Sequence, residues 1–191
     1  CKSMKNVDLK IAGFCGIIAP IVTIVLILIA IHYSPWFNWS ENALSDLGVN
    51  NKVAILFNSS LILCGFLVSI FAIGLRKILG ARLLGNIGAL TLFSTAIVLC
   101  GIGIFPENVE TIHLYLSLAF FGLLPISLFI IGLSMIIGQG YRKLGFVILI
   151  LSICSAMIWH LPKNGIAIHE SVASGAGACS CILLGIKLIT A

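Results

Sequence analysis

The sequence predicts an all-α membrane protein: a polytopic bundle of six transmembrane helices that forms one domain over residues 1–191. Hydrophobic residues make up 60% of the chain and charged residues only 9%, and the mean hydropathy is +1.21. These values lie far outside the range of soluble domains. The apolar residues are gathered into six stretches of about 20, the length that crosses a bilayer core. The loops between them are short, which leaves no room for a separate soluble domain.

The six predicted helices begin and end at recognisable residues. Pro20 lies inside the first helix, which ends at His32 before an aromatic belt that starts at Tyr33. Pro106 and Pro162 follow the third and fifth helices, because proline cannot continue the backbone ladder. We expect the helices at residues 11–32, 53–75, 83–104, 114–137, 144–161 and 167–188.

Small residues recur in the sixth predicted helix, at Ser174, Gly175, Gly177 and Ala178. Small side chains at this spacing let neighbouring membrane helices approach closely. We therefore predict that this stripe packs against another helix. Pro125, near mid-membrane in the fourth helix, predicts a kink there.

Charged residues are sorted between the two ends of the predicted bundle. Nine of the eleven basic residues fall at the end that carries both termini, which the positive-inside rule assigns to the cytoplasm. Five of the six acidic residues and all four histidines fall at the opposite end. We therefore predict a multi-pass protein of the plasma or cytoplasmic membrane, with its polar site on the extracytoplasmic side. The basic rim indicates orientation and contact with anionic lipid, and gives no reason to expect nucleic-acid binding.

The longest polar interval in the chain is residues 34–48, S-P-W-F-N-W-S-E-N-A-L-S-D-L-G. We interpret it as a cap over one end of the bundle. Two further polar loops, around His113 and over residues 160–170, come to the same end. Ser45 and Asp46 have an alternative interpretation as a helix cap or Asx turn, because such side chains readily bind free backbone N–H groups.

Imidazole and carboxylate groups at this end predict a hydrolytic metal site. They are the usual ligands of zinc, and an open fourth position lets the metal activate water for a neighbouring base. The predicted zinc ligands are His113, His160 and His169. The predicted catalytic residues are Ser45, Asp46 and Glu170, with Glu107 and Glu110 nearby. The alternative is that these side chains are solvated or join the loops by hydrogen bonds, since no diagnostic spacing such as H-E-x-x-H is present.

Two spaced motifs recur in the same order along the chain. G-x-R-x-L-G begins at Gly80 and again at Gly140, and P-x-N-x-x-x-I-H ends at His113 and again at His169. Ordered repetition of this kind predicts a duplicated helical hairpin. The two histidines would then occupy equivalent places and face a shared centre.

The loop motifs W-S-x-x-x-x-S-D-L-G, F-P-E-N…H and H-L-P…H-E, carried on six helices, resemble the membrane family filed as domain of unknown function 998. The resemblance covers nearly the whole chain, and it implies fold and topology rather than a known activity. The residue types of the predicted site are also similar to those of the alkaline ceramidase and progestin-receptor-like superfamily of transmembrane hydrolases. That similarity implies zinc bound among Ser45, Asp46, His113, His160 and His169. The chain departs from the superfamily in having six helices, adjacent Ser and Asp, and no H-x-x-x-H on the last helix.

Three functions are consistent with these patterns. The first is a metal-dependent hydrolase of a lipid amide or ester, because a site at headgroup depth meets those bonds. The second is a non-catalytic protein that binds a lipid or small molecule, or packs against a partner. The third is a transporter, although no charged residue lies at the midplane to relay a coupling ion. Membrane lipids are the expected partners, and the sequence predicts no particular oligomeric state.

Overall fold

The protein, in a computed structural model, is described over residues 2–49, 52–79, 82–138, 141–162 and 165–190. Within these ranges it is built of helices and contains no strand. The elements, with η marking a short 3₁₀ helix, are α1 (Lys2–His32), η1 (Leu44–Gly48), α2 (Ala54–Leu79), α3 (Leu83–Ile104), η2 (Glu107–Val109), α4 (Glu110–Ile137), α5 (Arg142–Met157), η3 (Ile158–His160) and α6 (Ala167–Ile189).

Six helices of the described chain are long and apolar enough to cross a membrane, which confirms the predicted fold class. Their ends differ from the prediction where polar residues continue a helix. α1 begins at Lys2 rather than residue 11, and α4 begins at Glu110 rather than residue 114. α5 ends early at Met157, because η3 tightens the last turn of that span. Hydropathy identifies only the apolar part of a helix, whereas the backbone hydrogen bonds of the helix continue into the polar residues next to it.

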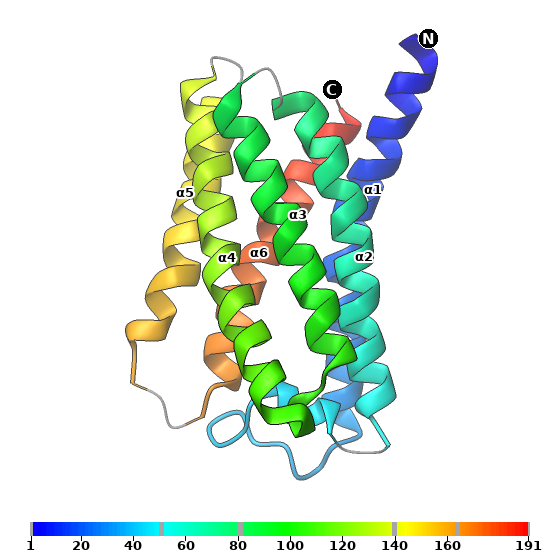
Figure 1. Cartoon of the computed structure of the whole chain (residues 1–191), viewed down its shortest axis with the longest axis vertical. Helices are drawn as coiled ribbons and strands as arrows, with labels where there is room; N and C mark the ends of the chain where they lie inside the picture. The colour runs from blue at the N-terminus through cyan, green and yellow to red at the C-terminus, as the bar shows by residue number, and fades with distance from the viewer. Residues whose placement is uncertain (1, 50–51, 80–81, 139–140, 163–164, 191) are drawn as a thin grey trace.

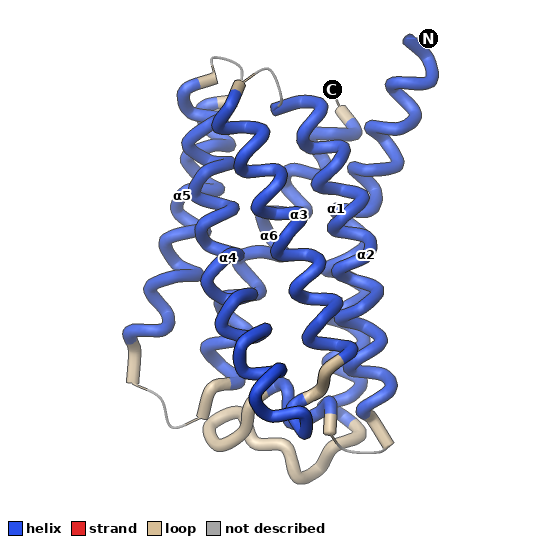
Figure 2. The backbone as a smooth tube through the Cα atoms, in the orientation of Figure 1, coloured by secondary structure: helices blue, strands red, loops and turns tan. Residues whose placement is uncertain are grey.

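The helices form a ring in which each packs against its neighbours in sequence, and α6 closes the ring against α1 and α5. Both termini lie at one end of the bundle (Figure 1). The loop of residues 33–43 and the three 3₁₀ helices gather at the other end, which we name the loop end (Figure 2). The prediction that both termini share one end is confirmed. Which end faces the cytoplasm stays a prediction.

Glycine pairs bring helix backbones into contact at two places. A methyl group on Gly13 would lie 2.7 Å from the carbonyl oxygen of Gly185, so α1 and α6 touch there. A methyl group on Gly145 would lie 2.8 Å from the carbonyl oxygen of Gly132, where α5 meets α4. Membrane helices associate by close packing of this kind, because lipid tails supply no hydrophobic driving force between them.

Serine hydroxyl groups join α5 to the helices on either side. Ser152 donates to the carbonyl oxygen of Pro125 on α4 (2.8 Å), and Ser155 donates to that of Ala173 on α6 (3.1 Å). A buried hydroxyl without a partner is costly in an apolar medium. The two bonds therefore determine which side of α5 faces the bundle.

Candidate functional site

Asn42 attaches the loop of residues 33–43 to the bundle. Its backbone carbonyl accepts the N–H groups of Ile166 (3.2 Å) and Ala167 (3.0 Å), at the start of α6. A helix leaves its first N–H groups without partners of its own, so this carbonyl satisfies two of them. The side-chain oxygen of Asn42 accepts the Asn38 N–H (2.9 Å), and its amide nitrogen donates to Oδ2 of Asp46 (2.8 Å). One asparagine thus connects the loop, η1 and α6.

η1 is folded around Asp46. Oδ2 of Asp46 also accepts the backbone N–H of Ala43 (3.0 Å), so the carboxylate holds the turn that leads into η1. The far end of η1 is held by α2, where the Asn58 amide donates to the carbonyl of Gly48 (3.0 Å). The helix-cap interpretation is therefore correct for Asp46, whose carboxylate caps the start of η1 whatever its chemistry.

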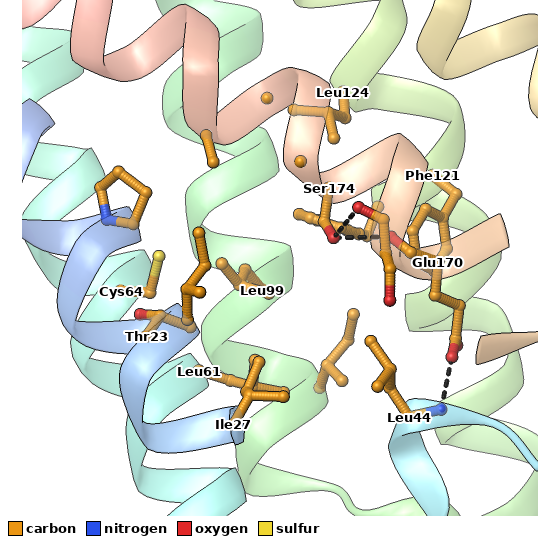
Figure 3. Close-up of a pocket in the computed structure, with 18 of the residues that line it drawn as sticks. Thr23, Ile27, Leu44, Leu61, Cys64, Leu99, Phe121, Leu124, Glu170 and Ser174 are labelled. Atoms are coloured by element: carbon orange, nitrogen blue, oxygen red, sulfur yellow. Dashed lines mark hydrogen bonds between the residues drawn. The ribbon is translucent and has the colours of Figure 1, made fainter. Parts of the chain in front are cut away.

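Glu170 joins the first turn of α6 to the start of η1. The residue is 7% exposed, and its Oε2 accepts the Leu44 N–H at 2.6 Å (Figure 3). Hydrogen bonds to an ionised acceptor are shorter and stronger than neutral ones. Ser174, one turn later, donates to the backbone carbonyl of Glu170 (2.6 Å), so its hydroxyl is satisfied within its own helix.

Three carboxyl groups from three elements meet at this end. Glu107 of η2 is half-buried and close enough to Asp46, Ser45 and His113 for electrostatic interaction, and its buried Oε2 has no hydrogen-bond partner among the described residues. Glu170 is close enough to Glu107 and Asp46 for their charges to interact. Repulsion between neighbouring carboxylates is relieved when one of them holds a proton. We call Ser45, Asp46, Glu107, His113 and Glu170 the polar cluster.

His113 completes the cluster from the first turn of α4. It is 7% exposed, and its Nδ1 lies 2.8 Å from the carbonyl oxygen of Phe105. A carbonyl oxygen only accepts, so Nδ1 carries the hydrogen, and Nε2 of the neutral ring keeps its lone pair. The charge of Glu107 interacts with this ring. The arrangement provides a base next to a carboxyl group, which is the minimum needed for acid–base chemistry.

The other two predicted zinc ligands lie elsewhere. His160 is exposed at the end of η3. His169 is 5% exposed, and its ring lies against Trp159 with the ring centres 5.9 Å apart. Across the described ranges, no three His, Cys, Asp or Glu side chains form a group that could hold a metal ion. The three histidines therefore do not fit a shared zinc site in this arrangement, and bound zinc stays a prediction.

The polar cluster borders a cavity of about 360 Å³ that extends into the bundle. Its wall consists mostly of apolar side chains from α1, α2, α3, α4 and α6 (Figure 3). Ser45, His113 and Glu170 line the part of the cavity nearest the loop end, and Val68 and Cys181 line the part nearest the middle of the bundle. From Glu170 to Cys181, α6 advances about 16 Å at 1.5 Å per residue. That depth is roughly half of a 30 Å bilayer core.

The stripe of small residues on α6 has two functions. The packing prediction is correct for Gly177, where an added methyl group would lie 3.0 Å from Cδ1 of Leu124. It is wrong for Gly175, where an added methyl group would meet no atom within 4 Å. Both glycines line the cavity, and only Gly177 also packs against a neighbouring helix. The sequence pattern could not separate the two, because both residues are small and only the position of the neighbouring helices distinguishes them.

Sequence reasoning undervalued two residues at this end. The sequence indicates no role for Glu107 beyond its position near the site, and the structure brings its carboxyl group close enough to Asp46 and His113 for their charges to interact. Its position directly after Pro106, at a helix end, was the available signal. Asn42 is one of several polar residues in the stretch 34–48, and nothing in the sequence around it indicates that its backbone carbonyl reaches α6.

Fold and site together define a multi-pass membrane protein with a polar cluster at the loop end of an apolar cavity. A family model described as "Protein of unknown function (DUF998)" matches residues 17–187, and the chain belongs to this family. The family resemblance of the loop motifs is thereby confirmed. A search of curated proteins and a search of solved structures found no match. The family description names no activity, and the comparisons give no support to the resemblance to transmembrane hydrolases.

Proposed function

We propose that the protein is a hydrolase of membrane lipids. The tail of the substrate occupies the apolar cavity, and its ester or amide bond lies at the polar cluster. One observation carries the proposal: Ser45, His113 and Glu170 line the loop end of a cavity whose remaining wall is mostly apolar. An amphipathic lipid has the same division between a polar linkage and an apolar tail.

The proposed reaction uses the chain's own acid and base. Water attacks the acyl carbonyl carbon, and Nε2 of His113 takes its proton. The bond from the acyl carbon to oxygen or nitrogen breaks, and the leaving group takes a proton from the carboxyl group of Glu107. The products are a fatty acid and an alcohol or amine. The proton on His113 then returns to Glu107, which restores both groups.

The other members of the polar cluster support this pair. Ser45 lies on the cavity wall beside Glu107, where its hydroxyl is suited to donate to the developing oxyanion. Asp46 and Glu170 hold η1 through the N–H groups of Ala43 and Leu44. We assign them a positioning role, because their oxygens are already engaged with the backbone.

Matched substitutions test the proposed activity on purified protein in lipid nanodiscs with acyl ester and acyl amide lipids. His113→Gln is expected to lower kcat by about 10²–10⁴, the usual contribution of a general base. His160→Gln is the control, because His160 is exposed at the same end. Glu107→Gln is compared in the same way with Glu110→Gln. Glu110 is a suitable control because it is exposed, as His160 is. Equal rates for a site variant and its control would refute the assignment.

A second function, lipid binding without hydrolysis, is favoured by the cavity itself. Its volume of about 360 Å³ lies within the range of ligand pockets, roughly 300–1,000 Å³. Lipid that co-purifies with the wild type and with His113→Gln in equal amounts, with no product formed by either, supports binding alone. Product formed by the wild type and lost in His113→Gln supports the hydrolase.

A further inference from the structure

The two helices that close the ring, α1 and α6, are in contact at the termini end. The backbones of Gly13 and Gly185 touch there, and each would place an added methyl group 2.7 Å from the other's carbonyl oxygen. Leu188 of α6 adds a further close approach to Gly13. No lipid tail passes between helices that are this close.

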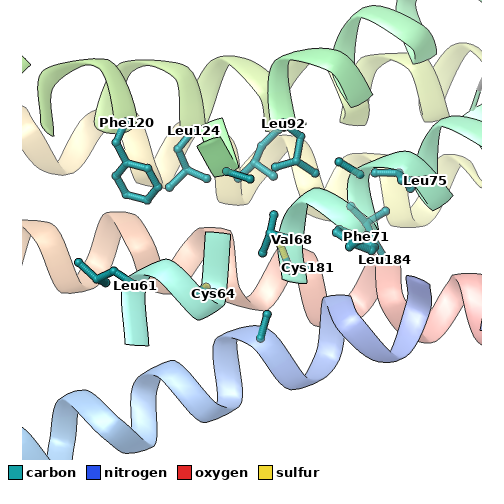
Figure 4. Packing of buried hydrophobic residues seen from close by; sticks show 14 of the residues in the cluster. Leu61, Cys64, Val68, Phe71, Leu75, Leu92, Phe120, Leu124, Cys181 and Leu184 are labelled. Carbon is teal, nitrogen blue, oxygen red and sulfur yellow. The ribbon is translucent and has the colours of Figure 1, made fainter. Parts of the chain in front are cut away.

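Toward the loop end the same two helices separate, as the course of α1 in Figure 4 shows. Ile24 and Leu28 of α1 line the cavity, and they are also 44% and 53% exposed. Ser171 and Gly175 of α6 line the cavity from the opposite side and are half-buried. Residues that border both the cavity and the exterior mark the rim of an opening.

The opening faces lipid rather than water. The residues of α1 next to the rim, Ile21 and Val25, are exposed and apolar, as a lipid-facing helix surface requires. Trp39, which also lines the cavity and is exposed, lies at the loop end, where membrane proteins place interfacial aromatic residues. The hydroxyl of Ser171 donates to the carbonyl of Ala167 in its own helix, so it presents no free donor to a passing tail.

The loop end of the cavity is acidic. The loop end carries five carboxyl groups, and Lys52 is the basic side chain that the described residues place there. The five are Glu41, Asp46, Glu107, Glu110 and Glu170. Even with Glu107 protonated, as the proposed reaction requires, the other four carboxyl groups disfavour a negatively charged headgroup and attract an ammonium group.

We propose that the cavity admits an amine-bearing lipid from the surrounding leaflet, tail first, through the opening between α1 and α6. The proposal rests on the lipid site of the proposed function and names its substrate class and route. The tail slides past Gly175, where the helix surface has no side chain, and fills the space down to Val68 and Cys181. The amine stays at the loop end of the cavity, beside the carboxyl groups of the polar cluster.

Photoreactive lipids test the route and the headgroup together. The protein is placed in phosphatidylcholine nanodiscs that contain a small fraction of a phosphatidylethanolamine or a phosphatidylglycerol probe, each with the same diazirine at the end of its acyl chain. After irradiation, adducts are located by peptide mass spectrometry. We expect adducts at Val68, Leu92 and Cys181, with the amine-bearing probe labelling about fivefold more than the anionic one.

Two glycines provide a matched pair for the route. Gly175→Leu fills the opening, and we expect it to lower labelling at Val68 and Cys181 about tenfold. Gly122→Leu is the control, because Gly122 also has no atom within 4 Å of an added methyl group and does not line the cavity. Thermal unfolding of both variants verifies folding, and Ser171→Leu replaces Gly175→Leu if the latter is unstable.

The outcomes separate this proposal from the hydrolase. Adducts confined to outward-facing residues such as Phe146 and Ile150, equal labelling by the two probes, or equal labelling in both glycine variants would each overturn it. Cavity labelling as expected, in a protein that forms no product, upholds the amine-bearing lipid and its route while refuting hydrolysis. Product formation with no labelling at Val68 or Cys181 refutes the route and leaves hydrolysis standing.

Discussion

The carboxylate of Glu170 provides the sharpest test of how the loop end is held. It is buried, and its bond to the Leu44 N–H is the direct hydrogen bond between the α6 side chain and η1. Glu170→Ala removes the acceptor and leaves a buried N–H unsatisfied, which costs about 2–3 kcal/mol. For a chain of 191 residues, each kcal/mol shifts Tm by about 2–4 °C. We therefore expect Tm to fall by roughly 4–12 °C.

Glu170→Gln separates the hydrogen bond from the charge. Glutamine keeps an acceptor oxygen for the Leu44 N–H, and it removes repulsion from Glu107 and Asp46. Its Tm should therefore equal or slightly exceed that of the wild type. Glu110→Ala, which changes an exposed carboxyl group at the same end, serves as the control and should leave Tm unchanged.

Tryptophan fluorescence during thermal unfolding in detergent measures this prediction directly. All three tryptophans lie at the loop end: positions 36 and 39 are in the loop between α1 and η1, and position 159 is in η3. A change in how η1 is held should appear in their emission before the helices separate. If Glu170→Ala proves as stable as the wild type, or if Glu170→Gln is as unstable as Glu170→Ala, the bond to Leu44 does not hold the loop.

Further predictions address the loop, the helix contacts and the metal. Asn42→Ala should lower Tm by several degrees, because a bond to the Asp46 carboxylate is worth about 1.5–3 kcal/mol, whereas the exposed Asn108→Ala should not. Gly145→Leu should destabilise the protein by about 3 kcal/mol or more, since an added side chain meets the α4 backbone at 2.8 Å, and an unchanged Tm would contradict this packing. Elemental analysis of purified protein tests the predicted zinc: a stoichiometric ion that survives dialysis and is lost in His113→Ala supports it and requires the histidines to move together, whereas no bound ion contradicts it.

The number, type and order of the helices could be read from the sequence. A bilayer core requires about 20 apolar residues per span, and that requirement leaves a pattern in composition that needs no knowledge of neighbours. Proline after α3 and α5 marked helix ends for an equally local reason. The gathering of acidic residues and histidines at one end followed from the order of the spans alone.

The membership of the site could be predicted only in part. Ser45, Asp46, His113 and Glu170 were expected at one end and do lie together. Each belongs to a loop or a helix end, and the alternating direction of successive spans brings these segments to the loop end. His160 and His169 lie at the same end but outside the polar cluster. The direction in which a side chain points depends on the rotation of its helix about the helix axis. A membrane helix that is apolar on all sides has no amphipathic pattern from which this rotation could be predicted.

What the sequence determined by itself is the membrane environment, the six spans and the end of the bundle at which polar chemistry collects. These follow from burial in lipid, which acts on each segment separately. The tertiary structure alone decided that Glu107 joins the polar cluster, that Asn42 connects the loop to α6, and that Gly177 packs against Leu124 while Gly175 meets no neighbouring helix. Those facts depend on contacts between segments far apart in the chain. A rotation of one helix about its axis would change which of its residues pack against a neighbour and which face the cavity.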